Sequence, residues 1–448
     1  MRLRTLAPLL LAALPGLASA TGLLDAWRAA EQHDREHAVA RAAHAAAQPR
    51  RDQAAALWRP GVALTAAAGW GQGDTEMRGA HFSAPGMGAA SGVDFGTSIH
   101  GGTATRWALQ ASQPLYNPQR RAQQQQLGLQ ADMAELEWQA ARQALMLRTA
   151  QRYFDLAVAE ESLRVLDRQL AAVQQAATEA QDRFTLGDAP VTDTHEARAR
   201  LAALRAQRLA AQTALDIQRR ALADSTGLPP TALSAQLPQA AADEATAPRT
   251  LQDWQQDAEA ANPAIRLRQL AADIAQAEAQ RHSRAASATV DLVAQAAQDR
   301  LQGGSSARNK NLNALVGVQL TVPLSTGGYR SAKEQEALRL HEAAQAQVQS
   351  TREQVAQQVH GAWLGLHLGA ERVQALAEAL AASEARRDAT QLGHAVGDRT
   401  LLDRLNTEND AAAARLALAQ ARAGLRLDRL RLAALAGRLD EDALRGAE

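Results

Sequence analysis

The sequence predicts a mainly α-helical protein of the α+β class that contains two copies of one unit. The composition is poor in aromatic residues, at 3%, and rich in Ala, Leu, Gln, Arg and Glu. This balance favours long, closely packed coiled-coil helices over a large globular core. A segment near the N-terminus recurs in the second half of the chain. In each half the apolar period changes in the same order, which predicts helix, strand, strand and long helix.

The first twenty residues have the features of a secretory signal peptide. Basic Arg2 and Arg4 precede an apolar run from Leu6 to Leu17, and Ala18-Ser19-Ala20 supplies small residues for cleavage. We therefore expect a mature protein that begins near Thr21 and works outside the cytoplasm. No later stretch approaches the roughly 20 consecutive apolar residues of a spanning helix.

The composition also excludes several classes of function. The 448 residues include no cysteine, so we expect no disulfide, thiol nucleophile, Cys-ligated metal or lipid-attachment cysteine. The formal net charge is zero, from 48 basic and 48 acidic residues, which gives no support for binding nucleic acid. We expect neither enzymatic activity nor a cofactor.

The internal duplication sets the expected domain boundaries. Leu23–Leu64 aligns with Leu251–Leu292 at a constant offset of 228 (251 − 23), and this alignment pairs Asp34 with Asn262. Later echoes have offsets of 209 (323 − 114) and 210 (397 − 187), so the second copy lacks about twenty residues, which the longer Gly-rich loop of the first copy supplies. The expected parts are a signal peptide (1–20), a first repeat (21–226), a linker (227–249), a second repeat (250–437) and a C-terminal tail (438–448).

Each copy contains a long helix and a shorter return helix. Apolar residues recur at steps of three and four from about Gln119 to Phe184, which predicts a helix about 100 Å long at 1.5 Å per residue. The second copy repeats this seam from Val355 to Leu380. Return helices are expected near 190–224 and 400–436, and first helices at about 22–57 and 250–284. The shorter helices would each cover half of a long one.

Matched turns connect each long helix to its return helix. They read Gly187-Asp188-Ala189-Pro190 in the first copy and Gly397-Asp398 in the second. Glycine tolerates the left-handed conformation that ends a helix, Asp is expected to cap the next helix, and Pro190 suits its first turn.

Four segments of about ten residues alternate apolar and polar residues and are expected to be strands. This length matches a tilted membrane strand. Two Gly/Ser-rich loops, residues 71–102 and 299–310, are expected to join them outside the membrane. Four strands cannot close a barrel in lipid, so the barrel must be shared between chains. Two copies give eight strands and three give twelve, and the larger number favours a water-filled conduit. The four expected strands begin at Val62, Trp107, Val290 and Leu312.

Several segments together resemble a known family: Leu57–Leu64, the strand-to-helix joins Gln113–Arg121 and Val322–Arg330, and the two helical turns. With these segments the sequence resembles the TolC family of outer-membrane efflux proteins. The resemblance implies a homotrimer in the Gram-negative outer membrane, with a twelve-stranded barrel, a helical tunnel through the periplasm and a mixed equatorial belt. It also implies a periplasmic adaptor and an inner-membrane transporter as partners. The function implied is a passive exit duct for efflux or type I secretion.

The resemblance further implies a gate at the helical turns. The family's gate arginine matches Arg399, and its partners on the other turn match Thr192 and Asp193. A guanidinium facing a carboxylate can donate two charge-assisted hydrogen bonds, and so could hold neighbouring hairpins shut. His394 replaces the family's tyrosine, which bonds to the Asp193 position. Of two acidic constriction positions, Asp403 matches, whereas the other is Asn406.

Three alternatives stay open at this point. The turns can be ordinary coiled-coil hairpins with solvated charges. The chain can be a soluble periplasmic adaptor or structural protein whose strands form a small sheet. His33 to His37 fits the H-x-x-E-H zinc-peptidase pattern, which would make Glu36 a base, although the equivalent stretch 261–265 has no metal ligand.

Overall fold

The computed structural model describes residues 22–86, 88–237, 249–285, 287–303 and 308–448. The expected signal peptide and the central part of the expected linker, residues 238–248, lie outside this set. The described residues form two compact units. We call them the helical unit and the sheet unit. The helical unit comprises 22–46, 133–270 and 346–448, and the sheet unit comprises 47–132 and 271–345.

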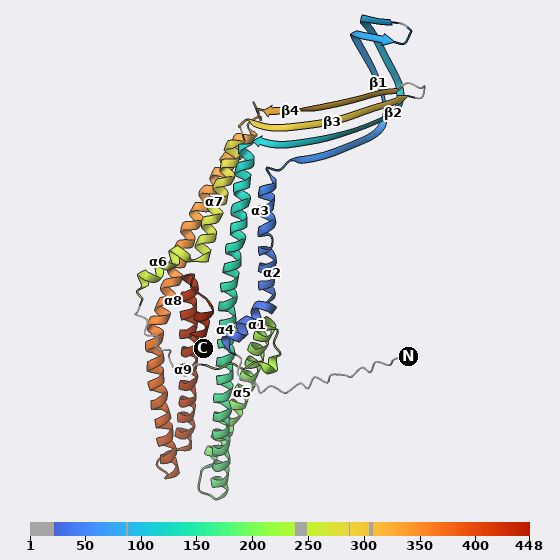
Figure 1. Ribbon diagram of the computed structural model, residues 1–448. Coiled ribbons are helices and arrows are strands. Elements are labelled where there is room, and N and C mark those ends of the chain that lie inside the picture. Colours follow the sequence, from blue (N-terminus) through green and yellow to red (C-terminus); the bar gives the residue numbers. More distant parts are fainter. Residues whose placement is uncertain (1–21, 87, 238–248, 286, 304–307) are drawn as a thin grey trace, which may run out of the picture. The chain divides into compact units, whose positions relative to one another are not determined.

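The sheet unit contains one antiparallel sheet built from both copies of the repeat (Figure 1). The strand order is β1-β2-β3-β4, so β2 of the first copy pairs with β3 of the second. The helix α3 (Ala47–Ala56) leads into β1. The strands are β1 (Gly61–Ala84), β2 (Gly88–Tyr116), β3 (Thr289–Gly303) and β4 (Arg308–Thr321).

The cross-strand register gives this sheet two different faces. Leu64 lies opposite Leu109, which lies opposite Ala296, which in turn lies opposite Ala314. Because opposite residues of an antiparallel pair point to the same side, the apolar positions of all four strands share one face. On the other face the ion pair between Arg106 and Asp299 joins β2 to β3 at 2.8 Å. The expected alternation of an apolar and a polar face is therefore confirmed.

The strands are longer than the sequence predicts. β1 has 24 residues and β2 has 29, so the expected loop 71–102 is mostly strand, paired as a two-stranded ribbon. Similarly, β3 extends to Gly303 and β4 begins at Arg308, within the other expected loop. The ribbon interrupts its register at Gly71/Gly73 and twice near Ala80. These irregularities hide the period of two that identifies a strand in sequence.

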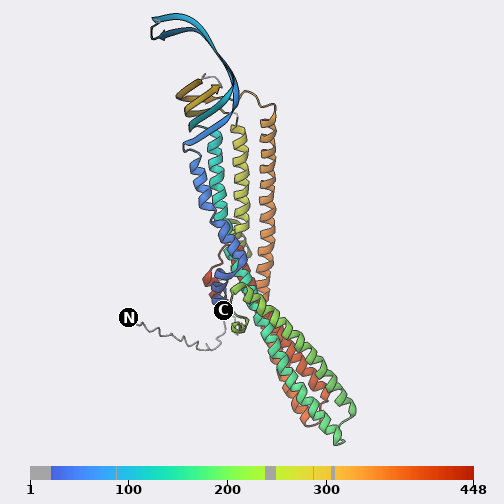
Figure 2. The same ribbon diagram turned by 90° about the vertical axis from the view of Figure 1, so that its right-hand side faces the viewer.

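Two antiparallel helical hairpins form much of the helical unit (Figure 2). In each, a long helix that also supplies residues to the sheet unit is followed by a return helix about half as long, as the seam predicts. Within the described ranges, no helix combines the length and hydrophobicity needed to span a membrane. The helices are α4 (Pro118–Thr185) with α5 (Val191–Thr226), and α8 (Tyr329–Ala395) with α9 (Leu401–Leu435).

The first helix of each copy, expected to be continuous, is broken at equivalent positions. Asp34 ends α1 (Leu23–His33), and Asn262 ends α6 (Leu251–Ala261); both have extended backbones, with ψ of 123° and 124°. Each side chain then caps the following helix. Asp34 accepts from His37 N at 2.9 Å, and Asn262 accepts from Ala264 N at 2.9 Å. The following helices are α2 (Arg35–His44) and α7 (Pro263–Arg284).

The expected C-terminal tail packs against the first helix of the chain. It contains the short helix α10 (Glu441–Arg445), and the side chains of Leu444 and Ala447 are fully buried in the same apolar core as Trp27. The Glu448 carboxylate accepts a hydrogen bond from Leu24 N at 2.8 Å. A carboxylate at this place stabilises α1, because the first amides of a helix have no partner within it. A short 3-10 turn, η1 (Pro230–Ala232), follows α5.

Candidate gate at the helical turns

The two turns that end α4 and α8 have the same hydrogen-bonded geometry. Gly187 and Gly397 have φ of 81° and 88°, in the left-handed region that glycine adopts without steric cost. Asp188 N donates to Arg183 O, and Asp398 N donates to Gly393 O, each at 2.8 Å. These are the bonds of a Schellman motif, which satisfies the last carbonyls of a helix. The sequence repeat therefore produces two equivalent tips.

The return helices begin differently in the two copies. In neither copy does the predicted Asp188 or Asp398 cap the helix. The N-cap of α5 is Pro190, which makes no side-chain cap, whereas the N-cap of α9 is Thr400. Thr400 and Asp403 form a capping box: Asp403 N donates to Thr400 Oγ1, and Thr400 N donates to Asp403 Oδ2, each at 3.1 Å. Asp188 and Asp398 are not in the capping position, because the N-cap residue lies two residues further along the chain.

The capping box also fixes the charge of Asp403. Hydrogen bonds from the Thr400 side chain and backbone, helped by the positive charge of Arg399, lower the pKa of Asp403 below its usual value. The carboxylate is therefore ionised at neutral pH. Asn406 lies one turn further along α9 and is exposed, so the side chains of Asp403 and Asn406 are neighbours on this helix.

The expected gate partners lie on separate tips and do not meet within one chain. Arg399 is exposed and its side chain covers Gly393, where a Cβ atom would lie 2.8 Å from Arg399 Cγ. Thr192 is exposed and Asp193 is half-buried in the first turn of α5. Among the described residues of one chain, no ion pair or hydrogen bond joins Arg399 to either of them.

A contact that the sequence did not reveal joins the two hairpins just above the tips. Glu179, near the end of α4, accepts a hydrogen bond from Arg404 Nη1 of α9 at 2.8 Å. Its other carboxylate oxygen lies 3.9 Å from Nδ1 of His394, whose side chain is only 9% exposed. His394 thus faces the first hairpin, but it reaches Glu179 and not Asp193. Helical spacing alone cannot find this contact, because Glu179 and Arg404 are 225 residues apart.

Apolar packing supports this polar contact. Leu401 and Leu405, in the first turns of α9, are buried in a small core with residues of α4 and α5. The hairpins of one chain are therefore joined at their tips by both apolar contacts and the Glu179 carboxylate. The other buried members of this core are Val173, Ala176, Ala180, Ala197 and Leu204.

The zinc-peptidase pattern does not assemble into a metal site. The helix break at Asp34 separates His33 from Glu36, and Glu36 instead pairs with Arg148 at 2.7 Å. His37 is buried and stacks on Trp138, with ring centroids 4.6 Å apart. In the described part of the chain, no three His, Asp or Glu side chains are grouped as metal ligands.

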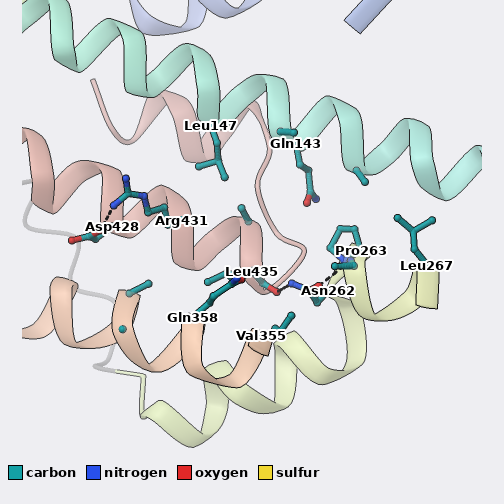
Figure 3. A pocket seen from close by; sticks show the side chains of 16 residues that line it. Gln143, Leu147, Asn262, Pro263, Leu267, Val355, Gln358, Asp428, Arg431 and Leu435 are labelled. Carbon is teal, nitrogen blue, oxygen red and sulfur yellow. Dashed lines mark hydrogen bonds and ion pairs between the residues drawn. The ribbon is translucent and has the colours of Figure 1, made fainter. Parts of the chain in front are cut away.

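The helical unit also contains a cavity of about 640 Å³ between α4, α7, α8 and α9 (Figure 3). Its walls are mostly aliphatic, and the polar side chains of Asn262, Asp428 and Arg431 are already paired. Asn262 Nδ2 donates to Leu435 O at 2.8 Å, and Arg431 pairs with Asp428 at 2.9 Å. This arrangement offers no evident catalytic group.

Solved structures of outer-membrane proteins have this fold. The Campylobacter jejuni CmeC outer membrane channel is similar with a TM-score of 0.77 and 15% identity, over 94% of this chain and 86% of that one. The outer membrane protein VceC from Vibrio cholerae is similar with a TM-score of 0.73 and 20% identity, over 93% and 96%. These likenesses show that the chain has the fold of outer-membrane proteins of this kind.

Sequence comparison identifies the family. A model of the outer membrane efflux protein family matches residues 26–228 and 254–438. The proteases secretion protein PrtF of Dickeya chrysanthemi is 26% identical over 402 residues, which cover 88% of this chain and 83% of that protein. The outer membrane protein TolC of Escherichia coli K12 is 25% identical over 357 residues, covering 76% and 71%. The chain belongs to the outer membrane efflux protein family.

Membership confirms the resemblance on which the functional expectations were based. The protein is an exit duct of the Gram-negative outer membrane that extends into the periplasm. This finding favours the duct over the soluble periplasmic adaptor that the sequence left open. The family consists of channels, and its TolC-like members are homotrimers that work with adaptors and inner-membrane transporters.

Proposed function

We propose that three copies of this chain close one twelve-stranded barrel in the outer membrane. In a single chain β1 and β4 are edge strands, because the sheet order places them at its two ends. Unpaired strand edges are too costly in lipid, and four strands are fewer than the smallest closed bacterial barrels contain. Pairing β4 of one copy with β1 of the next removes the open edges along the length of β4.

The gate of this duct lies at the helical tips, where Arg399 of one hairpin pairs with Thr192 and Asp193 of a neighbouring hairpin. The observation that carries this proposal is complementary charge on tips of equal geometry: an exposed cation on one turn, and a carboxylate with a hydroxyl beside it on the other. None of these groups has an ion-pair partner in the described residues of its own chain. Such exposed pairs contribute only about 0–1 kcal/mol each, so a gate built from them can open.

Asp403 forms the constriction of the proposed duct together with Asn406. In a trimer, Asp403 places three carboxylates around the lumen, and Asn406 adds polar groups without charge. A ring of carboxylates favours cations. Because the second ring is neutral, the preference is weaker than with six carboxylates. His394, which lies 3.9 Å from Glu179 within one chain, contributes to the link between hairpins as well as to the gate.

The proposed partners are a periplasmic adaptor and an inner-membrane transporter, which deliver cargo to the tips. Relatives include a protein named for protease secretion and another named as an outer membrane efflux protein. The cargo of this chain is accordingly a secreted protein or small molecules, and the duct itself conducts passively with no cofactor.

Single-channel recording tests the gate. Arg399→Ser should raise the conductance of the purified protein in a planar lipid bilayer, because it removes the cation that holds adjacent tips together. The matched control is Arg372→Ser, which removes an exposed arginine of the preceding helix α8, more than twenty residues before the turn that holds Arg399. Unchanged conductance in the Arg399 variant, with channels still forming, would contradict the proposed lock.

A further inference from the structure

A group of three cations lies on the apolar face of the sheet at the end of the β3–β4 hairpin. We define Arg300, Arg308 and Lys310 as the basic rim. Arg300 lies directly opposite Lys310, and Arg308 lies opposite Gln302. Lys310 is two residues before Leu312 on β4, so the two side chains point to the same face. The basic rim therefore lies on the same face of the sheet as Leu312, Val316 and Leu320, beyond the apolar part of β4.

No acidic side chain balances this charge on the same face. The stretch from 300 to 310 contains the three cations and no Asp or Glu. The neighbours of Arg300 and Lys310 along the same cross-strand row are Thr105 and Ala68. Among the described residues none of the three cations forms an ion pair; the nearby Asp299 belongs to the other face and binds Arg106.

Arg300 and Lys310 in fact repel each other. Like charges directly opposite in an antiparallel pair destabilise the sheet, so the arrangement is unfavourable unless an anion lies between them. Arg308 and Lys310 are exposed and can reach such an anion. A bound anion would also satisfy the Nε of Arg300, which is covered and has no hydrogen-bond partner among the described groups.

The position of the basic rim along the strands indicates where this anion comes from. The hairpin is the end of the sheet away from α7 and α8, and because the protein extends into the periplasm, this end lies on the outer side. Lys310 is about 7 Å along the strand from Leu312, at 3.4 Å per residue, which is just beyond the apolar band. Trp70, 79% exposed, lies in the same cross-strand row as Arg308. Tryptophan at this level is typical of the interface between lipid tails and headgroups.

We propose that the basic rim binds the phosphate groups of lipopolysaccharide, the phosphorylated glycolipid that forms the outer leaflet of Gram-negative outer membranes. Arginine and lysine donate charge-assisted hydrogen bonds to phosphate, and basic groups at the headgroup level attract anionic lipids. This inference rests on the proposed barrel, because the apolar face contacts lipid only if the barrel forms. It assigns a lipid contact on the outside of the duct, separate from the gate.

Binding of lipid A to the purified full-length protein in detergent tests the rim. The probes are lipid A with two phosphates, the same lipid with its phosphates removed, and inorganic phosphate alone. The wild type should bind the phosphorylated lipid about tenfold more tightly than the dephosphorylated one. The variant with Arg300→Gln, Arg308→Gln and Lys310→Gln should lose this preference. Lys310→Gln alone should reduce it, and provides a milder variant if the triple one does not assemble.

The control variant removes three other cations of the sheet unit that already have acidic partners. Arg78 pairs with Glu76, Lys333 with Glu336, and Arg339 with Glu342, each within 2.9 Å. Replacing these three by glutamine should leave the preference for phosphate intact.

A rim variant that keeps the preference overturns the proposal, as does displacement of the lipid by millimolar inorganic phosphate. Failure of the wild type to form channels in a phosphatidylcholine bilayer would count against the barrel itself, whereas channels without a phosphate preference count against the rim alone.

Discussion

At the scale of single residues, the main finding is that one carboxylate joins the two hairpins of a chain. Glu179 binds Arg404 and lies near His394, so it connects α4 with both helices of the second hairpin. The proposed lock at Arg399 acts between chains, whereas this link acts within one. Opening the duct by moving one hairpin against the other would have to break both kinds of contact.

We therefore expect Glu179→Ala to favour the open duct. Glu179 is 41% exposed, so solvent screens the pair, and its loss is worth about 0–1 kcal/mol, or at most about a fivefold change in the open population. Single-channel conductance measures the effect. Glu378→Ala, which removes an exposed glutamate bonded only to Gln374 of its own helix, is the control. An intact channel with wild-type conductance would show that Glu179 has no part in gating.

At the scale of elements, the duplication places equivalent helix breaks in both copies with different chemistry. Asn262 caps α7 and donates to Leu435 O, whereas Asp34 caps α2 and pairs with Arg148 at 2.7 Å. Burial alone would raise the pKa of Asp34. Hydrogen bonds from His37 N and Arg148, with the charges of Arg148 and Arg152, outweigh burial and lower the pKa below its usual value of 3.8.

These two breaks form a matched pair for measurement. Asn262→Ala should cost about 0.5–2 kcal/mol for the lost cap and about 0.5–1.5 kcal/mol for the lost hydrogen bond to Leu435 O. Asp34→Ala should cost about 1 kcal/mol more at neutral pH, because the second hydrogen bond that it removes, from Arg148, is charged. The free energy of unfolding in urea measures both.

The pH dependence distinguishes the two variants. Because the folded pKa of Asp34 lies below the unfolded value, its ionic contribution is complete above 3.8 and is lost as the pH falls through the folded pKa. The difference between wild type and Asp34→Ala should therefore shrink in acid, while that for Asn262→Ala should not change for this reason. Parallel pH profiles for the two variants would contradict the assigned ion pair.

The sequence predicts elements well where one physical period governs them. The seam of α4 extends for many turns, so the bounds of this helix are predicted to within a few residues, and the turns at Gly187 and Gly397 are predicted at their positions. The seam from Val355 to Leu380 identifies α8 but does not give its first residue, Tyr329. The ribbon of β1 and β2 is missed because glycines and register shifts interrupt its alternation. The breaks at Asp34 and Asn262 are visible only as aligned residues, since Asp and Asn also occur on exposed helix faces. The Glu179 contact depends on how two hairpins pack, which no local pattern contains.

At the scale of the whole molecule, the function depends on which face of the sheet meets lipid. Val316 and Leu315 are neighbours on β4 and are 75% and 60% exposed in the single chain. The register places Val316 opposite Ala294 on the apolar face, whereas Leu315 lies opposite Gln295 on the polar face. A soluble sheet would expose both residues to water, but a shared barrel exposes Val316 to lipid and Leu315 to the lumen.

Arginine at these two positions therefore separates the two arrangements. In the barrel, Val316→Arg places a charge among lipid tails and should destabilise the inserted state by about 2–4 kcal/mol per chain, whereas Leu315→Arg faces water and should be tolerated. The measurement is the yield of heat-modifiable trimer extracted from outer membranes with detergent. Because both variants introduce the same side chain at adjacent positions of one strand, general effects of arginine on expression or strand pairing are similar in the two. Equal yields of the two variants would contradict a lipid-facing apolar surface, and with it the shared barrel.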